Sequence, residues 1–287
     1  MKLEIISRYP SGSAHATPLL FVHGAWHAAW CWDVHFLDYF AQQGYAAHAL
    51  SLRGHGSSEG HDSLRWMRIA DYVADVAQAV KQLPAPPVLI GHSMGGFIVQ
   101  KYLEEHAAPA VVLLASVPPT GVLATTLRAA RRHPLIFAKA NLTFSLAPLM
   151  ATPALAREFL FSKDLPDGEV LSYWKRLQDE SYLAWLDMLA FNLPQPGKTA
   201  SPMLVLGGTN DSSLKPGQIK ATAHAYTARY EMIEGVAHDM MLDTQWRAVA
   251  ERIQAWLKEH ELPAEVSQQV ALNPIAMMSS IKANREN

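Results

Sequence analysis

A serine flanked by glycines at fixed spacing is the clearest chemical signal in the sequence. Gly91, Ser93 and Gly95 form the pattern G-x-S-x-G, which is typical of a nucleophile elbow, a strained turn between a strand and a helix. Glycines are needed there because the turn brings backbone segments close together. Residues 88–90 are apolar and a helical pattern follows Ser93. This context predicts a reactive hydroxyl at the N-terminus of a helix.

A serine hydroxyl becomes a good nucleophile only beside a base, and the base needs an orienting acid. In chains with such an elbow, the acid and then the histidine follow the serine in sequence, and they lie at the carboxyl ends of strands. Asp211 follows the apolar run 203–206, and His238 follows the next expected strand, near 229–233. The other position for an acid, residues 116–121, contains no Asp or Glu. We therefore predict Ser93 as nucleophile, Asp211 as acid and His238 as base.

Acyl transfer by a serine passes through an oxyanion, which two fixed N–H donors must stabilise. The backbone N–H of Met94, directly after Ser93, is one expected donor. The loop His23-Gly24-Ala25-Trp26 follows the first long apolar run, and the second donor is expected there, at Ala25. The ring of His23 is expected to brace this loop.

Regular secondary structure must position these groups, and the sequence indicates alternating strands and helices. Apolar runs near 19–22, 45–52, 88–92 and 110–115 alternate with helical patterns, one of them running from Trp30 to Phe40. This alternation predicts an α/β fold with a mostly parallel central sheet and helices on both faces. It stops near residue 120 and resumes near 202, with no clear strand between. We predict a core of residues 1–119 and 199–262, a helical cap of 120–198 and a C-terminal tail of 263–287.

Composition narrows the class of protein further. The 287 residues are 49% hydrophobic and 17% charged, with a net charge of −2, so we expect a packed core and no nucleic-acid partner. Arg128, Arg131 and Arg132 form the densest basic cluster and are expected to be a solvated helix face. The single cysteine, Cys31, excludes an intramolecular disulfide. The sequence shows no secretory signal and no apolar run long enough for a membrane span, so we expect a cytoplasmic protein. The sequence does not distinguish a monomer from an oligomer.

Taken together, these motifs resemble those of the α/β-hydrolase family, over about residues 19–260. The resemblance implies that fold, the roles given above for Ser93, Asp211, His238, Ala25 and Met94, and a cap over the site. The elbow resembles that of lysophospholipase-like and monoacylglycerol-lipase-like members, and the Gly24-Ala25-Trp26 loop resembles that of small esterases. The motifs are Phe21-Val22-His23-Gly24, Arg53-Gly54-His55-Gly56, Gly91-His92-Ser93-Met94-Gly95-Gly96, Gly207-Gly208-Thr209-Asn210-Asp211 and Gly235-Val236-Ala237-His238.

The expected function is that of a serine hydrolase that cleaves carboxylic esters of apolar substrates through an acyl-enzyme, with no cofactor. The segment 120–198 is rich in aromatic residues and methionine, which favours an apolar substrate. We expect the pocket to be lined by Trp26, Met150, Trp174 and Trp185.

Two alternatives to ester hydrolysis stay open at this level. The same scaffold hosts C–C bond hydrolases, perhydrolases, hydroxynitrile lyases and cofactor-free dioxygenases, and a non-catalytic binder of small ligands would keep the same fold. A metal site built from His23, His27, Asp33 and His35 is a weaker hypothesis, because the resembled fold places the first two in a loop and the last two on a helix. We therefore expect no metal.

Overall fold

The computed structural model describes residues 1–197 and 199–260, and its centre is a seven-stranded sheet. The strands lie in the order β1-β3-β2-β4-β5-β6-β7. All neighbouring pairs are parallel except β1 and β3, which are antiparallel, so the predicted mostly parallel sheet is confirmed. The strands are β1 (Glu4–Arg8), β2 (Leu19–Val22), β3 (Ala47–Ser51), β4 (Val88–His92), β5 (Val111–Leu114), β6 (Met203–Gly208) and β7 (Arg229–Ile233).

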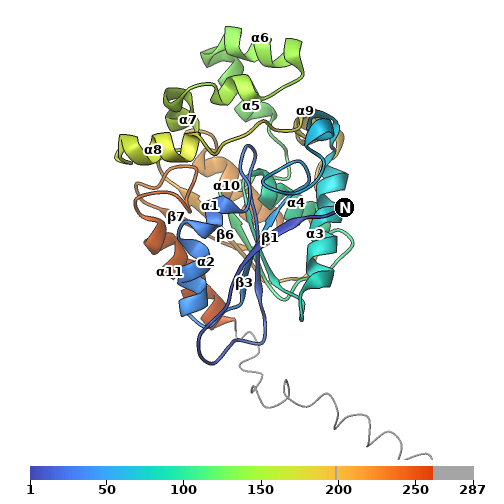
Figure 1. Ribbon diagram of the computed structural model, residues 1–287, viewed down its shortest axis with the longest axis vertical. Coiled ribbons are helices and arrows are strands. Elements are labelled where there is room, and N and C mark those ends of the chain that lie inside the picture. Colours follow the sequence, from blue (N-terminus) through green and yellow to red (C-terminus); the bar gives the residue numbers. More distant parts are fainter. Residues whose placement is uncertain (198, 261–287) are drawn as a thin grey trace, which may run out of the picture.

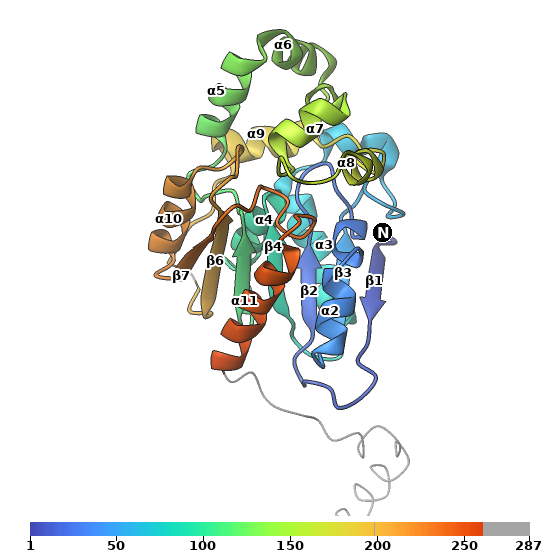
Figure 2. The ribbon, with the colours of Figure 1, turned by 90° about the vertical axis from the view of Figure 1, so that its left-hand side faces the viewer.

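Helices cover both faces of the sheet, and alternate strand residues pack under each layer. Phe21 of β2 packs in the core beneath α2 (Phe36–Gln42) and α11 (Trp246–Glu259). Its neighbour Leu20 packs in the core beneath α3 (Ile69–Gln82), α4 (Met94–Tyr102) and α10 (Pro216–Ala225). Figure 2 shows α2 and α11 in front of the strands and α3 and α4 behind them. Strands buried on both faces read as continuous apolar runs, which explains why the sequence revealed them.

Between β5 and β6 the chain leaves the sheet and folds into helices. These inserted helices lie together beyond the carboxyl ends of the parallel strands, at the upper end of the molecule in Figure 1. The described residues between 120 and 197 contain no strand. The elements are α5 (Leu123–Arg132), α6 (Pro134–Thr143), η2 (Ala147–Met150), α7 (Pro153–Phe159), α8 (Asp167–Trp174), α9 (Tyr182–Leu186) and the π-helical turn η3 (Asp187–Phe191).

One predicted helix is wrong in its extent. The sequence pattern from Trp30 to Phe40 is divided into α1 (Trp30–Asp33) and α2. The break falls before α2, where His35 has φ −141° and ψ −47°, outside the helical region. The ring of His35 stacks on Trp246 of α11, with ring centroids 4.4 Å apart. The apolar pattern in the sequence runs across the break because the buried side chains of α1 and α2 pack into the same core.

Three further points complete the fold. A 3₁₀ helix, η1 (His61–Trp66), precedes α3. No helix within residues 1–197 and 199–260 is both long and apolar enough to cross a membrane. The predicted tail, 263–287, lies outside the described residues.

Candidate active site

Ser93 stands on a strained turn between β4 and α4. Its backbone has φ 51° and ψ −115°, a conformation that non-glycine residues rarely adopt. Neighbouring backbone holds the turn: the Ser93 N–H donates to the carbonyl of Leu114 (3.0 Å), and its carbonyl accepts from the N–H of Val117 (3.1 Å). A Cβ atom at Gly95 would lie 2.3 Å from the carbonyl oxygen of Val22, so only glycine fits there. The sequence pattern therefore has a steric cause.

The structure brings the three residues predicted for catalysis into one hydrogen-bonded chain. The Oγ atom of Ser93 lies 3.0 Å from Nε2 of His238, and Nδ1 of His238 lies 2.8 Å from Oδ2 of Asp211. The other carboxylate oxygen of Asp211 accepts from the backbone N–H groups of Ser213 (2.7 Å) and Leu214 (2.8 Å). Because the carboxylate is fixed by these N–H groups, it can hold the imidazole in one orientation.

The electrostatic surroundings suit His238 to accept a proton. Burial lowers the pKa of His238, but the charge of Asp211, its hydrogen bond and the charge of Asp239 together outweigh burial, so the net pKa is raised above the ordinary value. A carboxylate beside Nδ1 favours the tautomer with the proton on that nitrogen. Nε2, facing the hydroxyl of Ser93, is then the acceptor. Geometry and charge together allow His238 to remove the serine proton.

These groups open onto one cavity beneath the inserted helices. Ser93 and His238 line it, together with Ala25 and Met94, the residues predicted to supply the oxyanion donors. Of the four residues predicted for the pocket, Trp26, Met150 and Trp185 line the cavity. Trp174 does not line the cavity. It packs against the core that contains Phe21, and its indole N–H donates to the carbonyl of Met150 (2.8 Å). The rest of the lining is mostly apolar and includes Val117, Val122, Ala129, Phe137, Leu146, Leu149, Phe159, Met188 and Leu214.

Comparison with known families agrees with this geometry. A family model described as "Alpha/beta hydrolase family" matches residues 19–252, most of the chain. The chain belongs to the alpha/beta hydrolase family. The fold and family predicted from the sequence motifs are thereby confirmed.

Individual relatives of this chain match only part of its length. It is 36% identical over 118 residues to a non-heme chloroperoxidase from Burkholderia pyrrocinia, which covers 38% of this chain and 40% of that protein. It is 35% identical over 112 residues to protein phosphatase methylesterase 1 from Bos taurus, covering 38% of this chain and 29% of that one. These matches thus span less than half of either relative. A monoacylglycerol lipase from Paleococcus ferrophilus shares the fold, with TM-score 0.68 and 20% identity over 91% of this chain and 100% of that chain.

Sequence reasoning missed one buried carboxylate at the candidate site. Glu180, between α8 and α9, is fully buried and lines the cavity. Its Oε2 accepts from the backbone N–H of Trp26 (3.4 Å) in the expected oxyanion loop and lies 3.1 Å from Nε2 of His55. Its Oε1 accepts from the hydroxyl of Tyr72 (2.9 Å) and the N–H of Ser181 (2.6 Å). Glu180 therefore links the inserted helices to the loop beside Ser93.

The pairing with Glu180 affects the pKa of His55. Burial lowers the pKa of His55, whereas the Glu180 carboxylate, the backbone carbonyl of Arg53 and the charge of Asp75 together raise it by more, so the net pKa lies above the ordinary value. The two residues are 125 positions apart in the chain. No periodicity or motif relates them, so a single sequence offers no signal for this contact.

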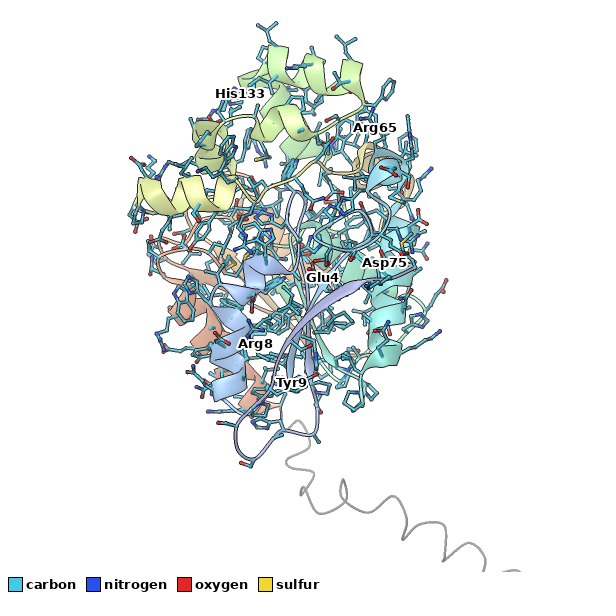
Figure 3. All side chains as sticks on the ribbon, in the orientation of Figure 1. Glu4, Arg8, Tyr9, Arg65, Asp75 and His133 are labelled. Atoms are coloured by element: carbon cyan, nitrogen blue, oxygen red, sulfur yellow. The ribbon has the colours of Figure 1, made fainter. Side chains whose placement is uncertain are left out.

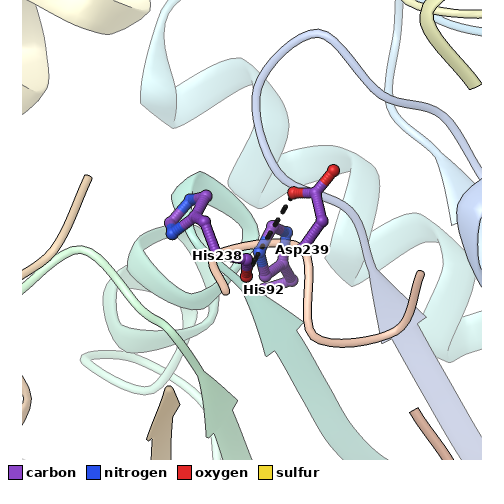
Figure 4. Close-up of side chains that lie close together, drawn as sticks. All are labelled: His92, His238 and Asp239. Atoms are coloured by element: carbon purple, nitrogen blue, oxygen red, sulfur yellow. Dashed lines mark hydrogen bonds and ion pairs between the residues drawn. The ribbon is translucent and has the colours of Figure 1, made fainter. Parts of the chain in front are cut away.

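A second histidine–aspartate cluster lies behind the site. His92, His238 and Asp239 have ligand-type atoms within 4.8 Å of one another, but Figure 4 shows the His238 ring directed away from Asp239. Both ring nitrogens of His238 already contact Ser93 and Asp211. Burial lowers the pKa of His92 to about 3, and its Nε2–H donates to the carbonyl of His238 (3.0 Å). This cluster therefore braces the backbone that carries His238.

The four residues weighed as a metal site do not converge. His23 braces its loop, as predicted: Nδ1 lies 2.8 Å from the carbonyl of Gly24, and Nε2 accepts from the N–H of Leu52. His27 pairs with Asp239 at 2.9 Å. Asp33 pairs with Arg8 at 2.7 Å, and His35 stacks on Trp246. Each side chain therefore has a separate structural partner.

Proposed function

We propose that this hydrolase cleaves carboxylic esters of apolar substrates through an acyl-enzyme on Ser93. One observation carries the proposal: the 3.0 Å and 2.8 Å contacts that join Ser93, His238 and Asp211 end in a cavity with a mostly apolar lining. The relation to protein phosphatase methylesterase 1, named for an esterase activity, supports the same reaction class.

The proposed reaction has two halves. Ser93 Oγ attacks the ester carbonyl carbon as its proton moves to Nε2 of His238, and the oxyanion accepts hydrogen bonds from the backbone N–H groups of Ala25 and Met94. The C–O bond then breaks, and His238 returns the proton to the departing alkoxide. Water attacks the acyl-serine with His238 as base, which releases the acid and restores Ser93. Asp211 orients and stabilises the imidazolium in both halves.

We also propose that the inserted helices act as a cap that selects the substrate. Phe137 of α6, Met150 of η2 and Trp185 of α9 line the same cavity as Ser93. An apolar wall forms no hydrogen bonds with a charged substrate, so a buried charge there would lose its hydration without compensation. The cap would therefore reject anionic acyl groups.

Two esters of similar size and the same leaving group test this selection. We expect kcat/KM for p-nitrophenyl butyrate to exceed that for p-nitrophenyl hydrogen succinate by roughly 100-fold or more, since an unpaired buried carboxylate costs several kcal/mol. Release of p-nitrophenol gives both rates. Ser93→Ala is the control for background hydrolysis. Equal rates would contradict an apolar acyl site, and no turnover of any ester by folded protein would favour a non-catalytic binder.

The pH dependence tests the role of His238. Its neutral form is the base, so kcat/KM should rise with pH through the pKa of His238. Asp211 raises that pKa, so we expect the midpoint above the ordinary value of about 6.5. In Asp211→Asn the lowering of the pKa by burial is opposed only by the charge of Asp239, so the midpoint should move to lower pH along with a large loss of kcat. A rate independent of pH between 5 and 9, or an unmoved midpoint in Asp211→Asn, would contradict this assignment.

The non-heme chloroperoxidase relative favours a second candidate reaction. Hydrogen peroxide could replace water in the second half, so that the acyl-enzyme releases a peroxy acid and restores the Ser93 hydroxyl. Both candidates share the first half and therefore the same acyl-enzyme. Measuring peroxy acid formed from p-nitrophenyl acetate with peroxide present, against Ser93→Ala, separates the two.

A further inference from the structure

Helix α6 presents apolar side chains to solvent at one end of the molecule. Leu135 and Leu142 are 85% and 82% exposed, and Ala138 between them is exposed too. Residues at this spacing share one face of a helix. In Figures 1 and 2, α6 stands at the top, at the opposite end from the C-terminus of α11. Single exposed leucines are common, but two on one face at a protruding end call for an explanation.

Other exposed apolar side chains lie on the segments next to α6. Phe144, at its C-terminus, is 49% exposed and contacts Trp66 of η1, with ring centroids 6.2 Å apart. Leu123 and Leu127 of α5 are also exposed, on successive turns of that helix. Figure 3 labels His133, which joins α5 to α6, at the same upper end. The surface therefore involves two adjoining helices rather than one side chain.

The inward face of α6 is fully engaged, so its outward face is separate from the substrate cavity. Phe137 lines the cavity and packs edge-on against Trp185, with centroids 6.0 Å apart. Asn141 accepts a hydrogen bond from the hydroxyl of Tyr182 (2.8 Å). Ala140 is buried. These contacts fix the orientation of the helix, and Leu135 and Leu142 are left outside.

Positive charge accompanies these leucines. Residues 120–157 contain five Lys or Arg and no Asp or Glu, whereas the whole chain has a net charge of −2. Arg131 and Lys139 are exposed, and neither lies within ion-pair distance of a carboxylate in the described part of the chain. Lys139 lies four residues after Leu135 and three before Leu142, on the same helical face. The surface thus combines leucines with uncompensated cations.

We propose that α6 and the adjoining end of α5 dock on an anionic lipid bilayer. Leu135 and Leu142 would enter the region between head groups and acyl chains, while Arg131 and Lys139 contact anionic head groups. A protein partner fits less well, because stable interfaces bury about 800 Å² on each side and a protruding helix of 10 residues is only about 15 Å long. Docking would place the substrate cavity directly beneath the membrane-bound helix.

Vesicle flotation with the 287-residue Ser93→Ala protein tests this surface without any turnover of lipid. We expect flotation with vesicles of equal phosphatidylcholine and phosphatidylglycerol, and much less with phosphatidylcholine alone. Leu135→Ser/Leu142→Ser should weaken binding by at least tenfold, since each leucine side chain loses its burial. Arg131→Glu/Lys139→Glu should weaken binding to the anionic vesicles by at least 25-fold, at about fivefold per lost cation.

Matched controls are exposed residues elsewhere. Leu171→Ser on α8 and Lys81→Glu on α3 should float like the parent protein. The leucine variants should unfold at the same temperature as the parent Ser93→Ala protein, which shows that they fold and keeps this test independent of the ester proposal. Absence of flotation with anionic vesicles would overturn the proposal, and so would undiminished flotation of the leucine variants. A dimer that dissociates in the leucine variants, without vesicle binding, would assign the surface to a second copy instead.

Discussion

Replacing Ser93 with alanine should reduce kcat for p-nitrophenyl butyrate by about 10⁴- to 10⁶-fold, because removing the nucleophile of such a triad removes nearly all covalent catalysis. KM should change little, since Oγ contributes to the reaction rather than to apolar binding. The fold should survive, because the backbone bonds of Ser93 to Leu114 and Val117 do not involve the hydroxyl. Steady-state kinetics and thermal unfolding of both proteins measure these effects.

The matched control is Ser63→Ala, which removes an exposed hydroxyl from η1 and should leave kcat within a factor of two or so. A Ser93→Ala protein that retains more than a small fraction of wild-type kcat would show that another group performs the attack. The whole assignment of Asp211 and His238 would then lose its basis, since both are placed by their relation to Ser93.

Replacing Glu180 with leucine should destabilise the protein by about 3–5 kcal/mol, because it leaves a buried histidine and a buried tyrosine hydroxyl without their partner. His55 and Tyr72 both contact the carboxylate inside the protein. Activity should fall too, because Trp26 of the expected oxyanion loop loses the acceptor of its N–H. Urea unfolding gives the stability change. A lowered kcat with a near-normal KM would indicate that the oxyanion loop is misplaced.

Glu180→Gln keeps the shape but removes the charge, and its effect should depend on pH. The folded-state pKa of His55 is raised above its ordinary value. Stability from the ion pair is therefore fully present below about pH 6.5 and is lost as pH rises through the raised pKa. The difference between wild type and Glu180→Gln should shrink between pH 6 and pH 9. Glu105→Gln, at an exposed site, should change stability by less than about 0.5 kcal/mol. A difference independent of pH would contradict a charged His55–Glu180 pair.

The sequence predicted the residues near Ser93 because local rules and strand topology position them. The elbow needs glycines for steric reasons, and the carboxyl ends of β4, β6 and β7 meet at one edge of the sheet. Asp211 and His238, 118 and 145 positions after Ser93, therefore lie beside it. Their catalytic roles stay predictions, as does the division into core and cap. The family and fold are confirmed by the family match and by the sheet itself.

The inserted helices were predicted least well, and for a physical reason. Aromatic residues at helical spacing show that a helix is amphipathic, but not whether the apolar side faces a cavity or the sheet. Trp174 and Trp185 read alike in sequence, yet only Trp185 lines the cavity. Glu180 has no pattern at all, because its partners are backbone and side chains from distant loops. Of the three arginines expected on a solvated helix face, Arg131 and Arg132 are exposed, but Arg128 is half-buried and donates to the carbonyl of Ser213. The apolar neighbours of Arg131 become visible only in three dimensions.

Fluorophosphonate labelling of the purified protein tests the central claim most directly. The account predicts one label per folded chain, located by peptide mass spectrometry on Ser93, with the rate of labelling reduced in His238→Ala and the label absent in Ser93→Ala. A label on another residue, or folded protein that stays unlabelled, would contradict Ser93 as the nucleophile.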